Sequence, residues 1–359
     1  MSIQPTSIGS SSARQPVAIS RPLRLAGSGC YLPRRCVGNT ELETRLGVSA
    51  GWIGEKTGIH HRHYADPATE SSPVMAAHAI RAALGDSGDE SPTDLLVCAS
   101  AIGSRPLPAT SCLVQRELGP AWAGVPCMDV NCTCLGFLCA LDMVASHLAC
   151  GRFRRVVIVC SEIASLGMNW AQPGSATLFG DAAVAFVVET AGDFPPRSAF
   201  LRTDPPALLH CRMATFSEGA DFCTVRGGGL ELPGWQYQES RHADYLFHMD
   251  GLRIHELASR RLPPFVREFL EEAETTLDEI DLVIPHQAGL LPLRIMQRKL
   301  GIPSGRFVIT LARHGNVISA SIPLALHLSR QEGRAHPGQR VLLLGTAAGL
   351  TLGAALLRL

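Results

Sequence analysis

The chain has 359 residues, a length that suits one large α/β unit or two domains of ordinary size. Lysine plus arginine and aspartate plus glutamate both number 32, so the net charge is zero and gives no case for nucleic-acid or membrane binding through an overall field. Every apolar stretch is interrupted by Ser, His or Gly before it reaches about 18 residues, which excludes a membrane-spanning helix.

The N-terminus differs from the rest in composition. Its first 40 residues contain no acid, and residues 1–22 are rich in Ser, Arg and Pro. A transit peptide has this composition, but ordered sequence begins near Leu23, so we interpret 1–22 as a disordered tail. The 12 cysteines are scattered through apolar runs and no secretory signal precedes them. We therefore expect reduced thiols and a cytoplasmic protein.

Five apolar, β-branched runs alternate with helical patterns along the chain, which predicts α/β layers with buried strands. The runs also repeat: 93–100 resembles 280–287, and 154–160 resembles 339–345. Such a long repeat predicts two similar α/β halves, residues 23–195 and 196–359, with the boundary in the Pro-rich stretch 192–210. The predicted strands lie at 93–100, 154–162, 182–189, 280–287 and 339–347.

The segment 132–152 also aligns with 314–334, at a shift of 182, and both segments end in Gly-Arg. At this shift Cys134 corresponds to Asn316. We therefore expect both residues at the starts of equivalent helices, whose N-termini converge if the halves pack by pseudo-symmetry.

The motif DVNCTCLGF (129–137) holds two cysteines at the start of a long apolar helix. Cys132 and Cys139 are read as core residues, and Cys132 with Cys134 lacks the second ligand pair that a zinc site needs, so no metal is expected. A thiol at a helix N-terminus feels the helix dipole and unpaired N–H groups, which favour the thiolate. Cys134 is therefore the candidate nucleophile, and the thiol expected to react first with iodoacetamide.

Two polar motifs in apolar surroundings support this reading. In IPHQAG (284–289) a predicted strand ends at His286, and in RHGN (313–316) Asn316 begins a predicted helix. Either residue alone could be a core histidine or a helix cap. A Cys, His, Asn order also occurs in papain-like proteases, but their local cysteine signature is missing.

Over residues 25–359 the sequence resembles the β-ketoacyl-acyl-carrier-protein synthase III group of the thiolase superfamily. The matching stretches are GSGCYLP (27–33), GWIGEKTGIHHRH (51–63), DVNCTCLGF, FGDAA (179–183), IPHQA, RHGN and AAGLTLGAALLRL (347–359). The resemblance implies a thiolase-like α/β/α/β/α fold of two pseudo-symmetric βαβαβαββ halves.

The resemblance implies that Cys134 is the acylated nucleophile and that His286 and Asn316 stabilise an enolate formed by decarboxylation of a malonyl thioester. An asparagine can donate a hydrogen bond but cannot accept a proton, which suits decarboxylative condensation. The N–H groups of Cys134 and of the Ala348-Gly349 turn, Gly349 in particular, would form the oxyanion hole.

The chain also departs from the family pattern. An arginine that stacks on the adenine of coenzyme A aligns with Pro173, whereas Trp52 and Lys56 are retained as substrate-binding residues. Leu107 aligns with a Phe that reaches into the partner subunit's acyl pocket, so chains longer than acetyl are expected. Gly289 and Leu291 replace the Asn and Arg of the family's HQANxR segment; Arg294, Arg298 and Lys299 on a helix over 292–301 are the candidate carrier-protein docking residues.

The sequence thus predicts a cofactor-free acyltransferase that acts on acyl-coenzyme A or acyl-carrier-protein donors and malonyl-carrier protein, works as a homodimer and initiates fatty-acid synthesis. One alternative is a condensing enzyme of secondary metabolism that uses a medium-chain or aryl starter. A chalcone-synthase-like enzyme is disfavoured because the GFGPG loop is missing. The alternative of another class is an inactive acyl-binding scaffold, which would not need Cys134, His286 and Asn316 together.

Overall fold

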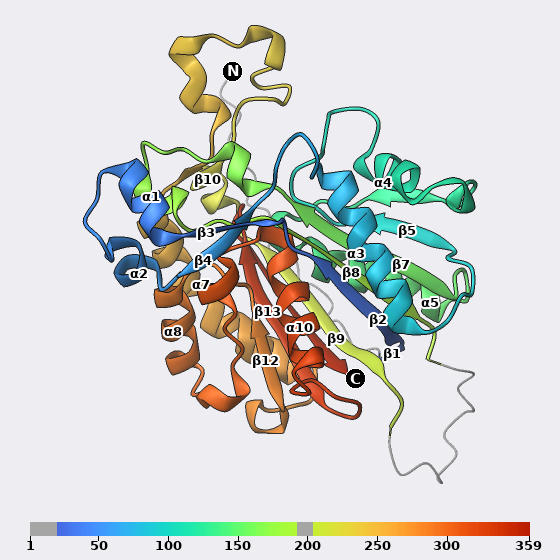
Figure 1. The fold of residues 1–359 in the computed structure, drawn as a ribbon. Helices are drawn as coiled ribbons and strands as arrows, with labels where there is room; N and C mark the ends of the chain where they lie inside the picture. Colours follow the sequence, from blue (N-terminus) through green and yellow to red (C-terminus); the bar gives the residue numbers. More distant parts are fainter. Residues whose placement is uncertain (1–19, 192–203) are drawn as a thin grey trace, which may run out of the picture.

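Two five-stranded sheets form the centre of the computed structural model, which describes residues 20–191 and 204–359 (Figure 1). The first sheet has the order β2-β8-β7-β5-β6. β5 runs parallel to β6 and β7, whereas β8 is antiparallel to β7 and β2. Its strands are β2 (Arg24–Tyr31), β5 (Leu95–Cys98), β6 (Cys127–Asp129), β7 (Arg155–Glu162) and β8 (Ala182–Glu189).

The second sheet has the order β1-β9-β14-β13-β12, and its strands β9, β14, β13 and β12 repeat the directions of β2, β8, β7 and β5. β12 runs parallel to β13, and β14 is antiparallel to β13 and β9. Its strands are β1 (Arg21–Pro22), β9 (Ala207–Thr215), β12 (Leu282–Pro285), β13 (Arg340–Ala347) and β14 (Thr351–Arg358).

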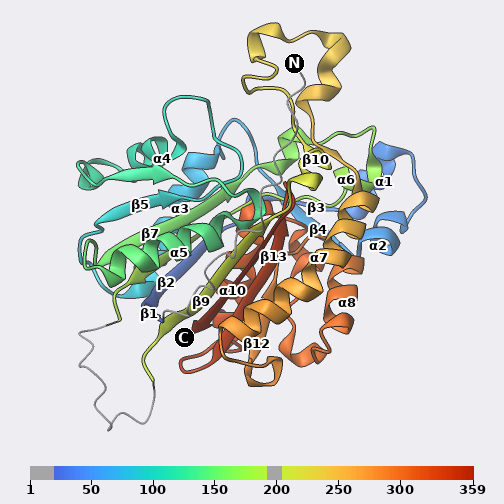
Figure 2. The ribbon, with the colours of Figure 1, turned by 180° about the vertical axis from the view of Figure 1, so that it is seen from behind.

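Two central helices, α5 (Gly136–Ala149) and α10 (Ser321–Gln331), lie between the sheets and contact both of them. Outside the first sheet lie α3 (Ser72–Ser87) and α4 (Thr110–Leu118), and outside the second lie α7 (Gly251–Glu272) and α8 (Leu290–Lys299) (Figures 1 and 2). The arrangement has five layers, so the predicted thiolase-like α/β fold is confirmed. No helix in the described ranges 20–191 and 204–359 is long and apolar enough to cross a membrane.

Smaller elements complete the chain at one end of the sheets. A projecting segment, drawn in gold in Figures 1 and 2, lies between β10 and β11 and exposes Leu230 and Trp235. The smaller elements at this end are β3 (Arg35–Gly38), α1 (Asn39–Leu46), α2 (Trp52–Thr57), β4 (His61–Tyr64), α6 (Pro173–Ala176), β10 (Cys223–Thr224), β11 (His248–Met249) and α9 (Leu311–His314).

Burial explains why the strand runs have little alternation. Every residue of β7 and of β8 is buried, because helices cover both faces of the sheet. The central helices bury their apolar residues against both sheets in one continuous core, and each fully buried Leu, Ile or Phe contributes about 1.5–3 kcal/mol. The five predicted strands are therefore found as β5, β7, β8, β12 and β13.

The two halves match more closely in structure than in the sequence alignment. A short 3₁₀ turn opens each central helix: η2 (Thr133–Leu135) before α5 and η9 (Ile318–Ala320) before α10. The first residue of each turn has a positive φ, 43° at Thr133 and 50° at Ile318. These two residues are equivalent, at a shift of 185, so Cys134 corresponds to Ser319 and Asn131 corresponds to Asn316.

The predicted shift of 182 at this point is therefore wrong. The shift of 182 assumes the same spacing between strand and central helix in both halves. In the second half, however, the short helix α9 lies between the strand-like segment at Phe307 and Asn316. The strand-like segment at Phe307 pairs in parallel with Val283 of β12, as β6 pairs with β5. The extra helix changes the spacing between strand and central helix in the second half.

Most of the predicted tail, and the predicted boundary at 195/196, lie outside the described residues. The end of the tail does not: Arg21 and Pro22 form β1, which pairs with β9 in the second sheet. The N-terminal segment therefore crosses from the edge of one sheet to β2 of the other. The backbone N–H of Leu23 donates to Pro206 at 3.3 Å where the chain makes this crossing.

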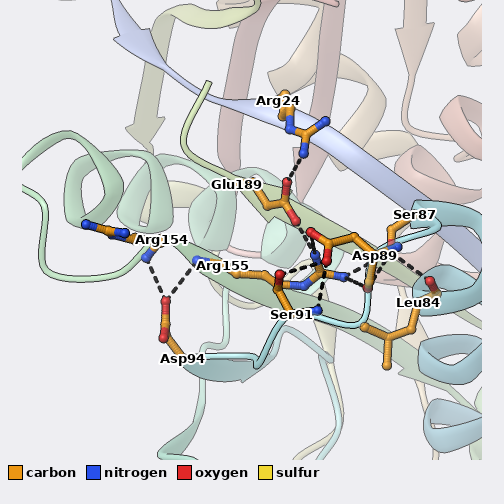
Figure 3. Close-up of polar contacts among 9 residues, drawn as sticks. All are labelled: Arg24, Leu84, Ser87, Asp89, Ser91, Asp94, Arg154, Arg155 and Glu189. Atoms are coloured by element: carbon orange, nitrogen blue, oxygen red, sulfur yellow. Dashed lines mark hydrogen bonds and ion pairs between the residues drawn. The ribbon is translucent and has the colours of Figure 1, made fainter. Parts of the chain in front are cut away.

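A buried ionic cluster closes the end of the first sheet where β7 begins (Figure 3). Arg155, 3% exposed, pairs with Glu189 of β8 and with Asp89, the latter at 2.9 Å. Its guanidinium also donates to the Ser87 hydroxyl at 2.9 Å. Arg24 of β2 pairs with the second oxygen of Glu189 at 2.5 Å. The cluster ties three strands and the end of α3 together.

Candidate active site

Cys134 lies in the 3₁₀ turn η2, directly before the central helix α5. The preceding residue, Thr133, is held in its left-handed conformation by Asn131, whose Oδ1 accepts the Thr133 N–H at 2.9 Å. After the cysteine comes Gly136, where a Cβ would lie 2.2 Å from the carbonyl oxygen of Ala99. Glycine is therefore needed for the helix start to lie against the segment that follows β5.

Asn316 precedes the equivalent turn η9 in the second half. Its Oδ1 accepts hydrogen bonds from the N–H of Ile318 at 2.9 Å and from the hydroxyl of Ser321 at 3.3 Å. These bonds orient the amide, since a backbone N–H can only donate. The Nδ2 group is left to donate to a bound molecule.

The backbone around Asn316 interlocks with the FGD motif of the first half. The Asn316 N–H donates to Leu178 at 2.8 Å, and the Gly180 N–H donates to the Asn316 carbonyl at 3.1 Å. A Cβ at Gly180 would lie 2.3 Å from the carbonyl oxygen of His314. Gly315 has φ 68°, and a Cβ there would lie 2.7 Å from the Leu178 carbonyl oxygen. The two glycines permit the close approach that places Asn316.

His286 follows directly after β12, and its N–H donates to Leu344 of β13 at 2.8 Å. Burial lowers the pKa of His286 to about 4, so the imidazole is neutral at pH 7. Its Nδ1 is buried and has no hydrogen-bond partner among the described residues. A neutral imidazole can donate one hydrogen bond without bringing a positive charge into the site.

Gln287, which the sequence analysis quoted without a role, fixes the loop that carries His286. Its Oε1 accepts the N–H groups of Thr310 and Leu311, and its Nε2 donates to Pro285 at 2.8 Å and to Val308 at 3.3 Å. The side chain thereby joins the strand end at His286 to the segment leading to Asn316. The available signal in the sequence was a glutamine directly after His286, at the end of an apolar strand.

The three predicted catalytic residues come from elements that meet between the halves. The turn η2 contacts both η9 and β13. A Cβ placed at Gly345 of β13 would lie 2.8 Å from His286 Cβ and 3.0 Å from the side chain of Leu135, the neighbour of Cys134. His286 and the nucleophile turn thus pack against the same glycine, and the turn that follows Asn316 packs against η2.

The thiol of Cys134 is not activated in the way its helix position suggested. Burial is the largest influence and, with the negative charge of Glu162 and the neighbouring Cys223, raises the pKa of Cys134 to about 12. The N–H groups of Cys134 and Ala348 oppose this rise but do not overcome it. The expectation of a lowered thiol pKa is therefore wrong for the resting protein, because desolvation exceeds the effect of the helix end.

The Ala348 N–H that acts on the thiol belongs to the turn between β13 and β14, as does Gly349, which has φ 135°. The described contact involves Ala348, so the assignment of the second oxyanion donor to Gly349 stays a prediction. A different thiol has the lowered pKa: a hydrogen bond with Cys132 lowers the pKa of Cys139 to about 7.

The predicted substrate-binding residues lie at separate places. Trp52 opens α2 and packs against a cluster that includes Met168 and Phe179, whereas Lys56 is exposed on the same helix. Pro173 opens the short helix α6. Near it Arg45 lies over the ring of Trp170, 3.8 Å from the centroid. Leu107 is 84% exposed, on a segment whose residues 102–109 are all exposed.

Arg294, Arg298 and Lys299 are all exposed on α8, the helix predicted at 292–301. Arg294 and Arg298 line an open depression of about 430 Å³, together with Gln297 and residues of the following loop. Arg294 donates to Gln297 at 3.2 Å. Their common location is as predicted, and their role in docking stays a prediction.

Comparisons with known proteins agree with this geometry. Residues 128–205 match the family described as 3-oxoacyl-[acyl-carrier-protein (ACP)] synthase III, and residues 270–359 match its C-terminal region. The β-ketoacyl-[acyl-carrier-protein] synthase III of Nitratidesulfovibrio vulgaris is 35% identical over 343 residues, which cover 95% of this chain and 100% of that protein.

Two solved structures are similar over nearly the whole chain. The 3-oxoacyl-[acyl-carrier-protein] synthase III of Aquifex aeolicus has a TM-score of 0.80 at 30% identity, covering 95% of this chain and 100% of that one. The priming β-ketosynthase of the R1128 polyketide pathway has a TM-score of 0.80 at 30% identity, covering 96% and 99%. The chain therefore belongs to the β-ketoacyl-acyl-carrier-protein synthase III family of thiolase-fold acyltransferases.

Proposed function

We propose that this enzyme transfers an acyl group from a thioester to Cys134 and condenses it with a malonyl group on an acyl carrier protein. The product is a 3-oxoacyl thioester. The observation that supports the proposal is that the elements carrying Cys134, His286 and Asn316 pack together between the halves, with His286 neutral and the Nδ2 of Asn316 free to donate.

In the first half-reaction the sulfur of Cys134 attacks the carbonyl carbon of the acyl thioester. The electron pair of the C=O bond moves to oxygen, which the N–H groups of Cys134 and of the Ala348-Gly349 turn stabilise. The carbonyl then reforms, the bond to the donor sulfur breaks, and the donor leaves as a thiol that takes up the proton lost by Cys134.

In the second half-reaction the bond between the malonyl carboxylate and its α-carbon breaks, and carbon dioxide leaves. The electron pair forms an enolate whose oxygen accepts hydrogen bonds from His286 and from Asn316. The α-carbon then attacks the acyl carbonyl on Cys134, and the cysteine sulfur leaves. The enolate forms without a proton-accepting base, which suits a neutral imidazole and an amide.

Two exposed features support the proposed partners. The basic residues Arg294, Arg298 and Lys299 on α8 suit an acidic carrier protein. The exposed Leu107 suits a homodimer in which this segment reaches the partner's acyl pocket. The reaction needs no metal or prosthetic group, and we expect it in the cytoplasm.

A second candidate has a specific observation in its favour. Pro173 stands where the family places an adenine-stacking arginine, and Leu107 stands where it places a bulky gate. Both departures favour a carrier-bound starter longer than acetyl, as a condensing enzyme of secondary metabolism would use. The similarity to a priming β-ketosynthase of a polyketide pathway points the same way.

The test is to incubate the protein with acetyl, butyryl, octanoyl and benzoyl thioesters on coenzyme A and on carrier protein, and to read the mass added to Cys134. Acyl groups longer than acetyl should label it, with binding improving by about 0.8 kcal/mol, or fourfold, for each buried methylene until the pocket is full. The variant Leu107→Phe should shorten the accepted chain.

The outcomes separate the candidates. Labelling by acetyl-coenzyme A alone would identify an ordinary fatty-acid initiator and overturn the pocket argument. Acylation without any condensation product after malonyl-carrier protein is added would indicate an acyl-binding scaffold. The control variant Cys134→Ala should take up no acyl mass.

A further inference from the structure

Glu162 is the last residue of β7, and it is 1% exposed. The proposed reaction gives it no role, and in the sequence it is only the end of an apolar strand. Its carboxyl lies where the two halves meet, because η9 of the second half packs against β7 of the first.

Two chains of hydrogen bonds start at this carboxyl. On one side its Oε1 accepts the Ala101 N–H at 2.6 Å, and the Ala101 carbonyl accepts from Asn131 Nδ2 at 2.9 Å. The Oδ1 of Asn131 in turn accepts the N–H of Thr133, the residue before Cys134. On the other side Oε1 accepts the hydroxyl of Ser319, three residues beyond Asn316. One oxygen atom therefore joins the nucleophile loop to the Asn316 loop.

The other oxygen is in a different situation. Oε2 is buried and has no hydrogen-bond partner among the described residues, and Glu162 forms no ion pair there. The titratable groups that feel its charge are the thiols of Cys98 on β5, Cys160 on β7 and Cys134 in η2. Burial without a cation raises the pKa of Glu162 to about 7, so the carboxyl changes charge within the physiological range.

We propose that Glu162 is a positioning residue for acyl transfer, which holds the Cys134 and Asn316 loops in register and whose negative charge, when present, opposes formation of the Cys134 thiolate. The neutral carboxyl keeps a carbonyl-type acceptor for Ala101 and Ser319 while removing the negative charge that opposes the thiolate. Once ionised, the same group makes the thiol harder to deprotonate.

This inference rests on the proposed function for its meaning but not for its test. Iodoacetamide alkylates a thiolate and needs no acyl donor, so its reaction with Cys134 follows the ionisation of that thiol directly. A failure of acyl labelling with normal alkylation behaviour would count against the proposed function alone.

The decisive variant is Glu162→Gln, which keeps the shape and the acceptor but cannot ionise. Cys134 alkylation is measured by mass spectrometry of its peptide from pH 5.5 to 8.5. The variant should match the wild type at pH 5.5 and exceed it at pH 8.5, by about tenfold for each pKa unit by which the carboxylate raises the thiol. Cys139, whose pKa is set by Cys132, serves as the internal control and should not change.

A second variant keeps the test open if Glu162→Gln folds poorly. Ser319→Ala retains the carboxyl but removes a hydroxyl that stabilises the carboxylate, so the pKa of Glu162 should rise. Cys134 alkylation rises about tenfold per pH unit until Glu162 ionises. In this variant the slower rise should therefore begin at a higher pH than in the wild type. Parallel alkylation profiles for the wild type and both variants across the whole pH range would overturn the proposal.

Discussion

The two ends of strand β7 treat buried charge in opposite ways. At its first residue, Arg155 is paired with Glu189 and Asp89 and also donates to Ser87 (Figure 3). At its last residue, Glu162 has a serine hydroxyl and a backbone N–H but no cation among the described residues. One strand of eight residues thus has a compensated charge at its first residue and an uncompensated carboxyl at its last.

We expect the first end of β7 to serve the fold and, following the proposal above, the last end to serve the chemistry. A paired buried charge holds neighbouring strands in place, and the pair is costly to break. An unpaired buried carboxyl has a perturbed pKa, and such groups gather at functional sites. The comparison predicts that substitutions at the two ends will separate stability from catalysis.

The largest effect is expected for Arg155→Leu at the paired end. It leaves Glu189 buried beside only Arg24, and breaking a buried pair by removing one partner typically costs about 3–5 kcal/mol of unfolding free energy. Denaturant unfolding measures the loss, while the acylation rate per folded molecule should be close to wild type.

The matched control is Arg24→Leu, which removes the more exposed partner of the same glutamate. Its side chain is 53% exposed, so the loss should be below about 1 kcal/mol. Equal losses for the two variants would show that Arg155 is not the residue that compensates the buried glutamate.

The next effect is expected at the site end, for His286→Ala and Asn316→Ala. Acyl-Cys134 should still form, whereas condensation with malonyl-carrier protein should fall about a hundredfold to a thousandfold, because each variant removes one preorganised donor to the enolate. Rapid-quench measurement of the two half-reactions distinguishes the steps. Equal losses in both half-reactions would contradict the assigned roles.

Asn131→Ala is the control for Asn316→Ala. Asn131 is the equivalent residue of the first half and its Oδ1 accepts the N–H two residues on in the same way, but its Nδ2 is bonded to the Ala101 carbonyl and cannot donate to substrate. Loss of this hydrogen bond should cost each variant about 1 kcal/mol of stability. A selective loss of condensation is expected for Asn316→Ala alone.

The smallest effect concerns the pH dependence of stability. Glu162 has a folded-state pKa of about 7 against an ordinary 4.5, so the folded state binds the proton more tightly and stability falls as pH rises from 4.5 through 7. The full difference corresponds to about 3 kcal/mol at most, since one pKa unit is 1.36 kcal/mol. Unfolding free energies of Glu162→Gln should fall less between pH 5 and 8 than those of the wild type.

The sequence predicted the features of the fold that depend on repeated local patterns. The apolar runs predicted β5, β7, β8, β12 and β13, and the repeat predicted two halves with two central helices. The family resemblance implied one site of Cys134, His286 and Asn316, and the elements that carry these residues pack together. The sequence motifs could not show which residues of the two halves are equivalent, because the helix α9 changes the spacing in the second half. The first apolar residue of α9, Leu311, looks like the end of the preceding strand-like run.

The electrostatics of the site were beyond local reading for a physical reason. The helix end favours a thiolate, but the burial that raises the pKa of Cys134 comes from residues far apart in the sequence. Glu162 showed no signal because a strand ending in glutamate is ordinary; its partner Ser319 lies 157 positions away. The role of Gln287 could not be predicted for the same reason, since its Oε1 accepts from Thr310, which lies more than 20 residues later in the sequence.

The matching left-handed residues Thr133 and Ile318 give the two halves the same backbone corner. In the first copy the corner presents a thiol at position 134, and in the second it presents the hydroxyl of Ser319, bonded to Glu162. The backbone therefore repeats while the side chains differ: at equivalent positions the first turn carries the proposed nucleophile, and the second carries the hydroxyl that donates to Glu162.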